Sequence, residues 1–341
     1  MEIEVMQLLW YLVLCAAVIF YTMLDGFDLG VGALHLFAKS DTDRRVFLNS
    51  IGPIWDGNEV WLIIIGGALF AGFPPAYATI FSSFYTLLMI FLAGIIFRAV
   101  AIEFRSKHES FRWRQSWDII FSLGSVIIAW GVGVVLGNLI LGIPIDQNGV
   151  FKGTFWGMLN LYSVLVGFLG LSLFMLHGQI FLLMKTEGDL HDRIRKWIKP
   201  LMTFFIVMFV VVSLDTYHTA PHMRERFSEL PWLSIVPLCM IFFIIMIPVM
   251  VKKGNDGFGF IFSSLVIISL FTLYGIGMFP AIVPSTINPE YTLTLYNSSS
   301  AYKTLEVILI IACIGVPMVL MYGFFIYHIF RGKVKIDKMS Y

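Results

Sequence analysis

The sequence predicts an all-α polytopic membrane protein with about nine transmembrane helices. Of its 341 residues, 58% are hydrophobic and only 13% are charged, and the mean hydropathy is +0.85. The surface of a water-soluble globule needs many more charges than this chain has. The net charge of +1 gives no broad basic field, which argues against nucleic acid as a partner.

Nine apolar segments are long enough to cross a bilayer, which takes roughly 20 helical residues. No segment has the composition of an interdomain linker and no repeat with a fixed period is present, so we expect a single integral membrane domain over 1–341. The second and sixth segments are the shortest. The nine segments are about 7–36, 54–72, 76–103, 115–140, 155–184, 198–214, 230–250, 258–279 and 303–330.

The lysines and arginines between these segments predict the orientation of the chain. Eighteen of them fall in alternate loops and the C-terminal tail, and Arg98 lies inside a span. By the positive-inside rule, the N-terminus is outside and the C-terminus is cytoplasmic. The opposite side carries only Lys152, Arg224, Arg226 and Lys303.

Six ionisable side chains lie toward the predicted cytoplasmic ends of the first four spans, and together they resemble a polar entrance. Asp25 and Asp28 are three residues apart and share a helical face. They lie about 12–16 Å from the inner end of the first span, at 1.5 Å per residue. The six are Asp25, Asp28, Asp56, Glu59, Arg98 and Asp118.

Tryptophans accompany three of these charges. Trp55 and Trp61 bracket the second pair of carboxylates, and Trp117 precedes the carboxylate of the fourth span. Amphipathic indole rings favour the membrane interface, so we expect these three residues to have interfacial or structural roles.

Two physical roles are open for the buried charges. A charge at mid-bilayer costs about 2.5–3.5 kcal/mol on insertion scales, so Asp25 and Asp28 should face protein or water. The functional role is a proton path between carboxylates and ordered water. The alternative is an ion-pair cluster around Arg98 that only holds four helices together, with Asp56, Glu59 and Asp118 as ordinary interfacial charges.

Pairs of glycines predict close helix packing. Gly26 and Gly30 in the first span, and Gly133 and Gly137 in the fourth, are four residues apart. Small residues at this spacing let the backbones of membrane helices approach one another.

No residue pattern predicts a catalytic or metal centre within this chain. His35 and His177 lie in spans and could ligate haem iron, but hydrogen-bonded helix contacts are the commoner use of such histidines. Asp215, His218 and His222 crowd the outer end of the sixth span, where a metal site competes with a solvated loop. The cysteines show no CxxC or Cys/His spacing.

Several motifs closely resemble subunit II of the cytochrome bd quinol oxidases, and the resemblance covers almost the full chain. The first half carries LDGFDLGVG at 24–32, NSIGPIWDGNEVWL at 49–62, Phe97-Arg98 and Trp117-Asp118. The second half carries FSSL at 262–265, MFP at 278–280 and NSSS at 297–300. The region 140–255 is less distinctive.

This resemblance implies a subunit of a respiratory quinol:O2 oxidoreductase in the cytoplasmic membrane of a bacterium or archaeon. It implies a partner, subunit I, that carries haems b and d, oxidises quinol and reduces O2 to water, with protons taken from the cytoplasm. It implies two four-helix bundles plus a peripheral helix, and it places Asp25 and Asp56 at positions implicated in a proton route. It also admits a structural quinone, membrane lipids and a small accessory subunit as partners.

Two other classes of protein stay open. A proton-coupled secondary transporter also carries intramembrane carboxylates, but it should show a midplane site, broken helices and inverted repeats. A purely structural membrane subunit would lose assembly, and not turnover per assembled complex, when Asp25 is neutralised.

Overall fold

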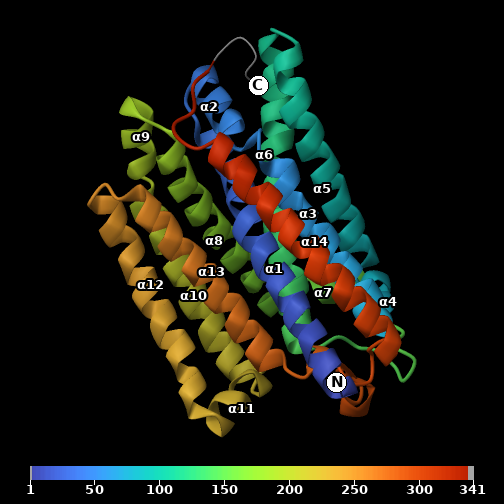
Figure 1. The fold of residues 1–341 in the computed structure, drawn as a ribbon. Helices are drawn as coiled ribbons and strands as arrows, with labels where there is room; N and C mark the ends of the chain where they lie inside the picture. Colours follow the sequence, from blue (N-terminus) through green and yellow to red (C-terminus); the bar gives the residue numbers. More distant parts are fainter. Residues whose placement is uncertain (1, 337–341) are drawn as a thin grey trace.

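The computed structural model describes residues 2–336 and is built mainly of helices (Figure 1). The helices are α1 (Ile3–Leu34), α2 (Asp41–Ile51), α3 (Trp55–Gly72), α4 (Pro74–Ser83), α5 (Tyr85–Phe104), α6 (Phe111–Leu141), α7 (Phe155–Met158), α8 (Leu161–Lys185), α9 (Gly188–Arg195), α10 (Ile198–Thr219), α11 (His222–Glu229), α12 (Ile235–Lys252), α13 (Asp256–Met278) and α14 (Tyr302–Ile329). Two short antiparallel strands, β1 (Ala281–Val283) and β2 (Leu293–Thr294), pair with each other.

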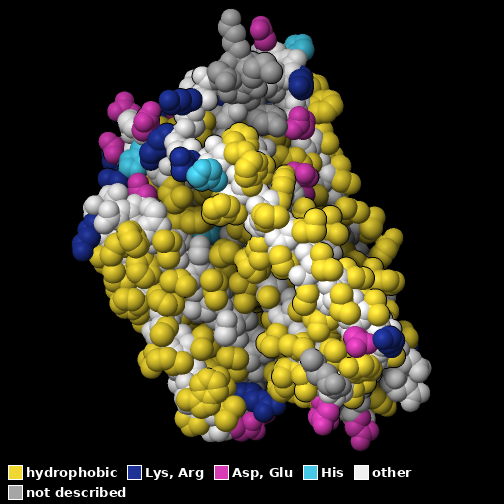
Figure 2. All heavy atoms as spheres, viewed as in Figure 1, with side chains coloured by type: hydrophobic (Ala, Val, Ile, Leu, Met, Phe, Trp, Pro, Cys, Tyr) yellow, Lys and Arg dark blue, Asp and Glu magenta, His cyan; other side chains and the backbone are white. Residues whose placement is uncertain are grey.

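The helix lengths and compositions confirm the prediction of an all-α polytopic membrane protein. Within the described residues, eight helical segments are long and apolar enough to cross a bilayer. A ninth span results if α2 and α3, which meet at a bend of 49°, are counted together. Figure 2 shows hydrophobic side chains over the middle of one face and most charged side chains near its two ends.

Contacts between the helices divide most of them into two groups. In the first group α1 packs against α3 and α6, and α6 packs against α5. In the second group α8 contacts α10 and α13, and α12 contacts α10 and α13. Helix α14 lies against α1 and α3, and its most apolar stretch has no buried residue. This grouping agrees with two bundles and a peripheral helix, whose detailed arrangement stays a prediction.

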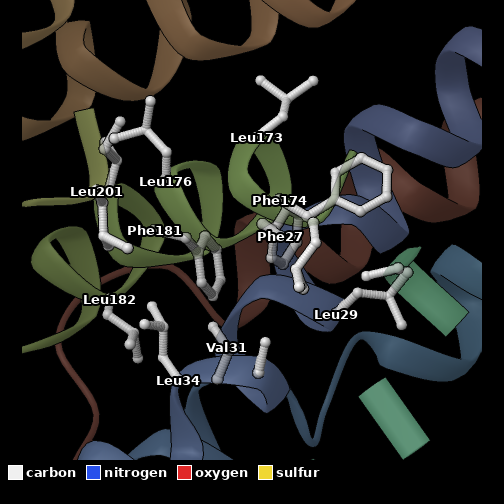
Figure 3. Packing of buried hydrophobic residues seen from close by; sticks show 14 of the residues in the cluster. Phe27, Leu29, Val31, Leu34, Leu173, Phe174, Leu176, Phe181, Leu182 and Leu201 are labelled. Atoms are coloured by element: carbon white, nitrogen blue, oxygen red, sulfur yellow. The ribbon is translucent and has the colours of Figure 1, made fainter. Parts of the chain in front are cut away.

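Helix α8 joins the two groups because it packs tightly against both α1 and α6. Side chains of α1 and α8, with Leu201 of α10, interdigitate in the core between them (Figure 3). Phe27 and Phe181 stack there with ring centroids 4.0 Å apart. Lipid tails are as apolar as these side chains, so close packing, and not the hydrophobic effect, holds membrane helices together.

The structure differs from the predicted spans at three places. The predicted first loop contains α2, because Ser40 and Asp43 form a capping box that starts a helix. The predicted span 76–103 consists of two helices, α4 and α5, which divide at Phe84. The predicted span 155–184 also divides, because the Asn160 side chain accepts a hydrogen bond from the Ser163 amide and begins α8 afresh.

The long polar segment after α13 forms a compact loop structure that the hydropathy pattern does not predict. The β1–β2 hairpin lies in it, and Ile143 forms a bridge to Ser285. The Gln7 side chain donates to the Tyr296 carbonyl and to the Ser299 hydroxyl, which ties the start of α1 to this loop. This end of the molecule is opposite the end that carries α2 and α9 (Figure 1).

Candidate functional site

A buried guanidinium joins two carboxylates at the centre of the candidate site. Arg98 of α5 is fully buried. Its Nη1 donates to Glu59 Oε1 of α3 at 2.6 Å, and its Nη2 lies 3.2 Å from Asp25 Oδ1 of α1. Three helices therefore meet through one cation, which is the only cation in ion-pair contact with these carboxylates within residues 2–336.

The carboxylates of this site are arranged from the surface inward. Asp56, in the first turn of α3, is exposed. The Glu59 side chain, one turn further along α3, is 17% exposed, and the Asp25 side chain is 2% exposed. The four side chains Asp56, Glu59, Arg98 and Asp25 thus lead from the surface of the chain to its interior.

Asp28 lies beside this group and has different partners. Its Oδ2 accepts a hydrogen bond from Asn58 Nδ2 at 2.7 Å, and Asn58 Oδ1 accepts one from the Tyr327 hydroxyl at 2.8 Å. Asp28 is fully buried, and Asn58 is buried as well. A hydrogen-bonded chain therefore connects α14 through α3 to α1.

Several buried polar atoms around these residues have no hydrogen-bond partner in the described part of the chain. They include the Tyr21 hydroxyl, one oxygen each of Asp25 and Asp28, and Nε and Nη2 of Arg98. An unsatisfied buried polar group costs about 1–3 kcal/mol, and ordered water commonly occupies such positions. Asp25 Oδ1 and Arg98 Nη2 face each other in the ion pair, so the positions that bound water could occupy are at the Tyr21 hydroxyl, Asp28 Oδ1 and Arg98 Nε.

The structure places Asp118 in a separate network, so the six predicted side chains do not form one continuous group. Asp118 Oδ1 accepts from His35 Nε2 at 2.6 Å and from Arg105 Nε at 2.5 Å. Its Oδ2 accepts from Arg44 Nη1 at 2.8 Å and from Arg105 Nη2 at 3.2 Å. Arg105 also donates to Asp41 of α2. This network ties α2 and α6 to the turns that directly follow α1 and α5, at the end of the molecule that carries α2.

The three predicted tryptophans have different surroundings. Trp61 is buried and stacks on Phe20 with ring centroids 4.4 Å apart, so it packs α3 against α1. Trp55 and Trp117 are partly exposed, and Trp117 lies edge-on to Trp113.

The predicted glycines lie where two helices cross α8. A Cβ added to Gly30 would lie 1.8 Å from the Phe174 carbonyl oxygen, and one added to Gly26 would lie 2.9 Å from the Phe174 ring. On α6, a Cβ at Gly133 would lie 2.5 Å from the Val166 carbonyl oxygen. Because these neighbours include backbone atoms, no larger side chain fits at Gly30 or Gly133 unless the helices separate.

Sequence reasoning missed five residues that complete the two networks. Asn58 and Tyr327 position Asp28, and their only signal is that Asn58 lies between two predicted carboxylates. Arg44, Arg105 and Asp41 belong to the Asp118 network. From the sequence, the two arginines are loop charges that set the orientation, because the sequence does not show which charges form ion pairs.

The histidines in the spans make hydrogen bonds within the protein. His177 uses both ring nitrogens, with Nδ1 2.7 Å from the Ser263 hydroxyl and Nε2 3.0 Å from the Met23 carbonyl oxygen. His35 bonds to Asp118 through Nε2. Within residues 2–336, no three side chains of the types His, Cys, Asp and Glu are grouped so that they could hold a metal ion.

A lateral cavity of about 650 Å³ opens between α1, α3, α5, α6 and α13. Its lining is almost entirely apolar, with Leu69, Phe91 and Val135 among the lining residues. Tyr21 and Trp130 also line it, and the Tyr21 hydroxyl and the Trp130 indole N–H are buried without a partner in the described residues. The Trp130 nitrogen lies against Gly167 of α8, which does not line the cavity, so the cavity suits an apolar molecule.

Comparisons with known proteins agree on one family. The sequence model of the family described as cytochrome bd terminal oxidase subunit II matches residues 6–330. Cytochrome bd-I ubiquinol oxidase subunit 2 of Escherichia coli (strain K12) is 33% identical, with 98% of this chain and 96% of that protein covered. Cytochrome bd ubiquinol oxidase subunit 2 of Bacillus subtilis (strain 168) is 32% identical, with 96% of each chain covered. A chain in the structure of bd oxidase from Geobacillus thermodenitrificans has a similar fold, with a TM-score of 0.77 at 14% identity, covering 96% of this chain and 98% of that chain.

Proposed function

Because the chain belongs to the family of cytochrome bd terminal oxidase subunit II, we propose that it carries protons from the cytoplasmic side toward a haem-bearing subunit I. The chain is a subunit of an oxidoreductase complex and a multi-pass membrane protein. Quinol oxidation and reduction of O2 to water would occur on the partner, where haems b and d would be bound. Proton supply from the cytoplasm to that reaction would contribute to the proton motive force.

One observation supports the path above all others. A fully buried guanidinium bridges a partly exposed carboxylate, Glu59, and a buried one, Asp25. Asp56 extends this series to the surface. Carboxylates in such surroundings can exchange protons with one another through ordered water, and Asp28 Oδ1, which is buried without a partner in the described residues, leaves room for this exchange.

The side of α3 that carries Asp56 is the surface we assign to the partner. Asp56, Ile63, Gly67 and Phe70 are exposed and follow one side of the helix. Lipid tails cannot solvate a carboxylate, whereas a partner subunit that covers this side of α3 can pair with it. This assignment also accounts for a path that contains no catalytic centre of its own.

Two variants of the assembled complex test the path. Asp25→Asn and Asp56→Asn should assemble with normal haem content but consume oxygen more slowly than the wild type. The deficit should grow as the pH rises, because proton supply then limits turnover. A complex with Asp25→Asn that assembles normally and turns over at the wild-type rate across the pH range would show that Asp25 is not an essential conduit.

The partner assignment has its own test. A complex purified through a tag on this chain should give the bands of b- and d-type haems in a dithionite-reduced minus air-oxidised spectrum. A featureless spectrum from an intact preparation would contradict the oxidase assignment and favour the transporter alternative.

A second proposal concerns the lateral cavity, which we infer to hold a structural quinone. An almost entirely apolar lining fits the isoprenoid tail of a quinone. Gly131 lines this cavity, and a Cβ there would meet no atom within 4 Å. Gly131→Phe should therefore lower the quinone extracted from the purified complex, whereas Gly323→Phe, on the open surface of α14, should not. Equal quinone content in both variants would contradict this site.

A further inference from the structure

Asp28 differs from the other buried carboxylates because its contacts are neutral. In the described part of the chain no arginine or lysine forms an ion pair with it, whereas Asp25 and Glu59 both contact Arg98. Its one hydrogen bond comes from Asn58, an amide. The inference below rests on the proposed proton path, since it concerns what Asp28 does beside that path.

The charges around Asp28 do not balance if every carboxylate is ionised. Helix α1 contributes Asp25 and Asp28, α3 contributes Glu59, and α5 contributes the single cation Arg98. Three negative charges would then face one positive charge in the interior. An isolated ionised carboxylate is so costly to bury that such a group generally takes up a proton instead. Asp28, which is fully buried and has no contacting cation, is the member of this set that gains most from being neutral.

We propose that Asp28 binds and holds a proton beside the path, and that Asn58 and Tyr327 are the residues that position it. A neutral carboxyl group has one C=O, which accepts hydrogen bonds, and one O–H, which donates. Oδ2 accepts from Asn58 and therefore corresponds to the C=O. Oδ1, which is buried and has no partner within residues 2–336, corresponds to the O–H.

Tyr327 lies at the other end of the Asn58 amide. Its hydroxyl donates to Asn58 Oδ1, and the Asn58 NH2 group points to Asp28. An amide in this orientation donates a hydrogen bond but does not pass a proton on. The chain toward α14 is therefore a dead end for protons, and exchange with Asp28 must occur at Oδ1, the oxygen that is buried without a partner in the described residues.

Infrared spectroscopy with isotope-labelled aspartate tests this proposal directly. Only protonated carboxyl groups absorb in the carboxylic acid C=O region, and a spectrum with carboxyl-13C aspartate minus an unlabelled spectrum isolates those of aspartate. The assembled wild-type complex at neutral pH should show such a band. Asp28→Asn should remove it, and Tyr327→Phe should shift it to higher frequency because a misaligned Asn58 binds the C=O less well.

Tyr322→Phe is the matched control, because Tyr322 lies on the same helix and is exposed. It should leave the band unchanged. Absence of the band in the wild type, its persistence in Asp28→Asn, or an unshifted band in Tyr327→Phe would each overturn the proposal. If Asp28→Asn fails to assemble, the wild-type band and the effect of Tyr327→Phe still decide the question, since that variant loses only a hydroxyl.

The two proposals fail separately. Wild-type turnover of Asp25→Asn at every pH would refute the path and leave the infrared band unaffected. Absence of the band in the wild-type complex, together with slow oxygen consumption by the Asp25→Asn complex, would refute the role of Asp28 and leave the path intact.

Discussion

Replacing Arg98 with methionine separates a proton path from a purely structural ion-pair cluster. The substitution leaves Asp25, with a side chain that is 2% exposed, and Glu59, with one that is 17% exposed, without their shared cation. Removing one partner of a buried ion pair typically costs about 3–5 kcal/mol. Because Glu59 is partly exposed, we expect a loss of about 3 kcal/mol, at the lower end of this range. Arg112→Met, at an exposed position near the start of α6, is the control and should have little effect.

The triple variant Arg98→Met, Asp25→Asn, Glu59→Gln removes the uncompensated charges together with the cation. Replacing a whole buried ionic group by neutral residues is often close to neutral for stability, so the triple variant should recover most of what Arg98→Met loses. Such recovery is the non-additivity expected of groups in one network. The amount of assembled complex and its thermal unfolding midpoint in detergent measure both effects.

Oxygen consumption per haem then distinguishes the two roles. A proton path predicts that the triple variant is assembled but slow, and slower still at high pH. A structural cluster predicts that turnover returns together with stability. If the triple variant regains stability and also consumes oxygen at the wild-type rate, the path is refuted. If Arg98→Met alone is as stable as the wild type, the reasoning about uncompensated charge is refuted.

Three further outcomes follow from the packing and the charges. Gly30→Ala should destabilise the complex by about 1–3 kcal/mol or more, the range typical of overpacking, because the added Cβ would meet backbone atoms of α8. Gly66→Ala is the control, since a Cβ there would meet no atom within 4 Å. Equal thermal unfolding midpoints of the two variants would contradict this reasoning. Asp118→Asn should cost about 3–5 kcal/mol, because the carboxylate is buried among cationic donors, and Asp41→Asn, at a far more exposed partner, should cost less in the same thermal assay. Burial lowers the pKa of His222, which lies on α11 outside the spans, so the folded state binds this proton less readily than the unfolded state. The free energy of unfolding is therefore unaffected by His222 above the ordinary histidine pKa of about 6.5 and falls as the pH drops below it. His222→Gln should flatten this part of the stability–pH curve.

The sequence predicts the helices of this fold well because hydropathy acts along each segment by itself. Long apolar runs, the burial of Asp25 and the close approach at Gly30 all depend on local spacing and on the cost of charge in a membrane. The capping box at Ser40 is a local signal too, and it predicts a helix, α2, in the segment that hydropathy alone assigns to a loop. By contrast, the hairpin after α13 depends on contacts with residues far away in the sequence, such as Ile143 with Ser285.

The pairing of the charges could not be predicted in the same way. Whether Asp118 meets Arg98 or Arg105 depends on how each helix is rotated about its axis and on where the loops place their ends. Several charges at a similar depth allow many pairings, and only the packed structure selects among them. Tyr327 shows the same limit, since 269 residues separate it from the Asn58 side chain to which it donates.

The selected pairings give the two carboxylate sites opposite chemical characters. Each oxygen of Asp118 accepts two hydrogen bonds, so both oxygens have their lone pairs occupied by donors. Protonating Asp118 would break at least one of these bonds and leave buried cations uncompensated. Asp28 keeps a buried oxygen, Oδ1, without a partner in the part of the chain that the structure describes, so a proton or a water molecule can be added there without displacing a donor, whereas Asp25 Oδ1 faces Arg98 Nη2 at 3.2 Å. Asp118 is therefore suited to holding α2, α6 and the turns after α1 and α5 in place, which is why we propose the carboxylates around Arg98, and not Asp118, for proton exchange.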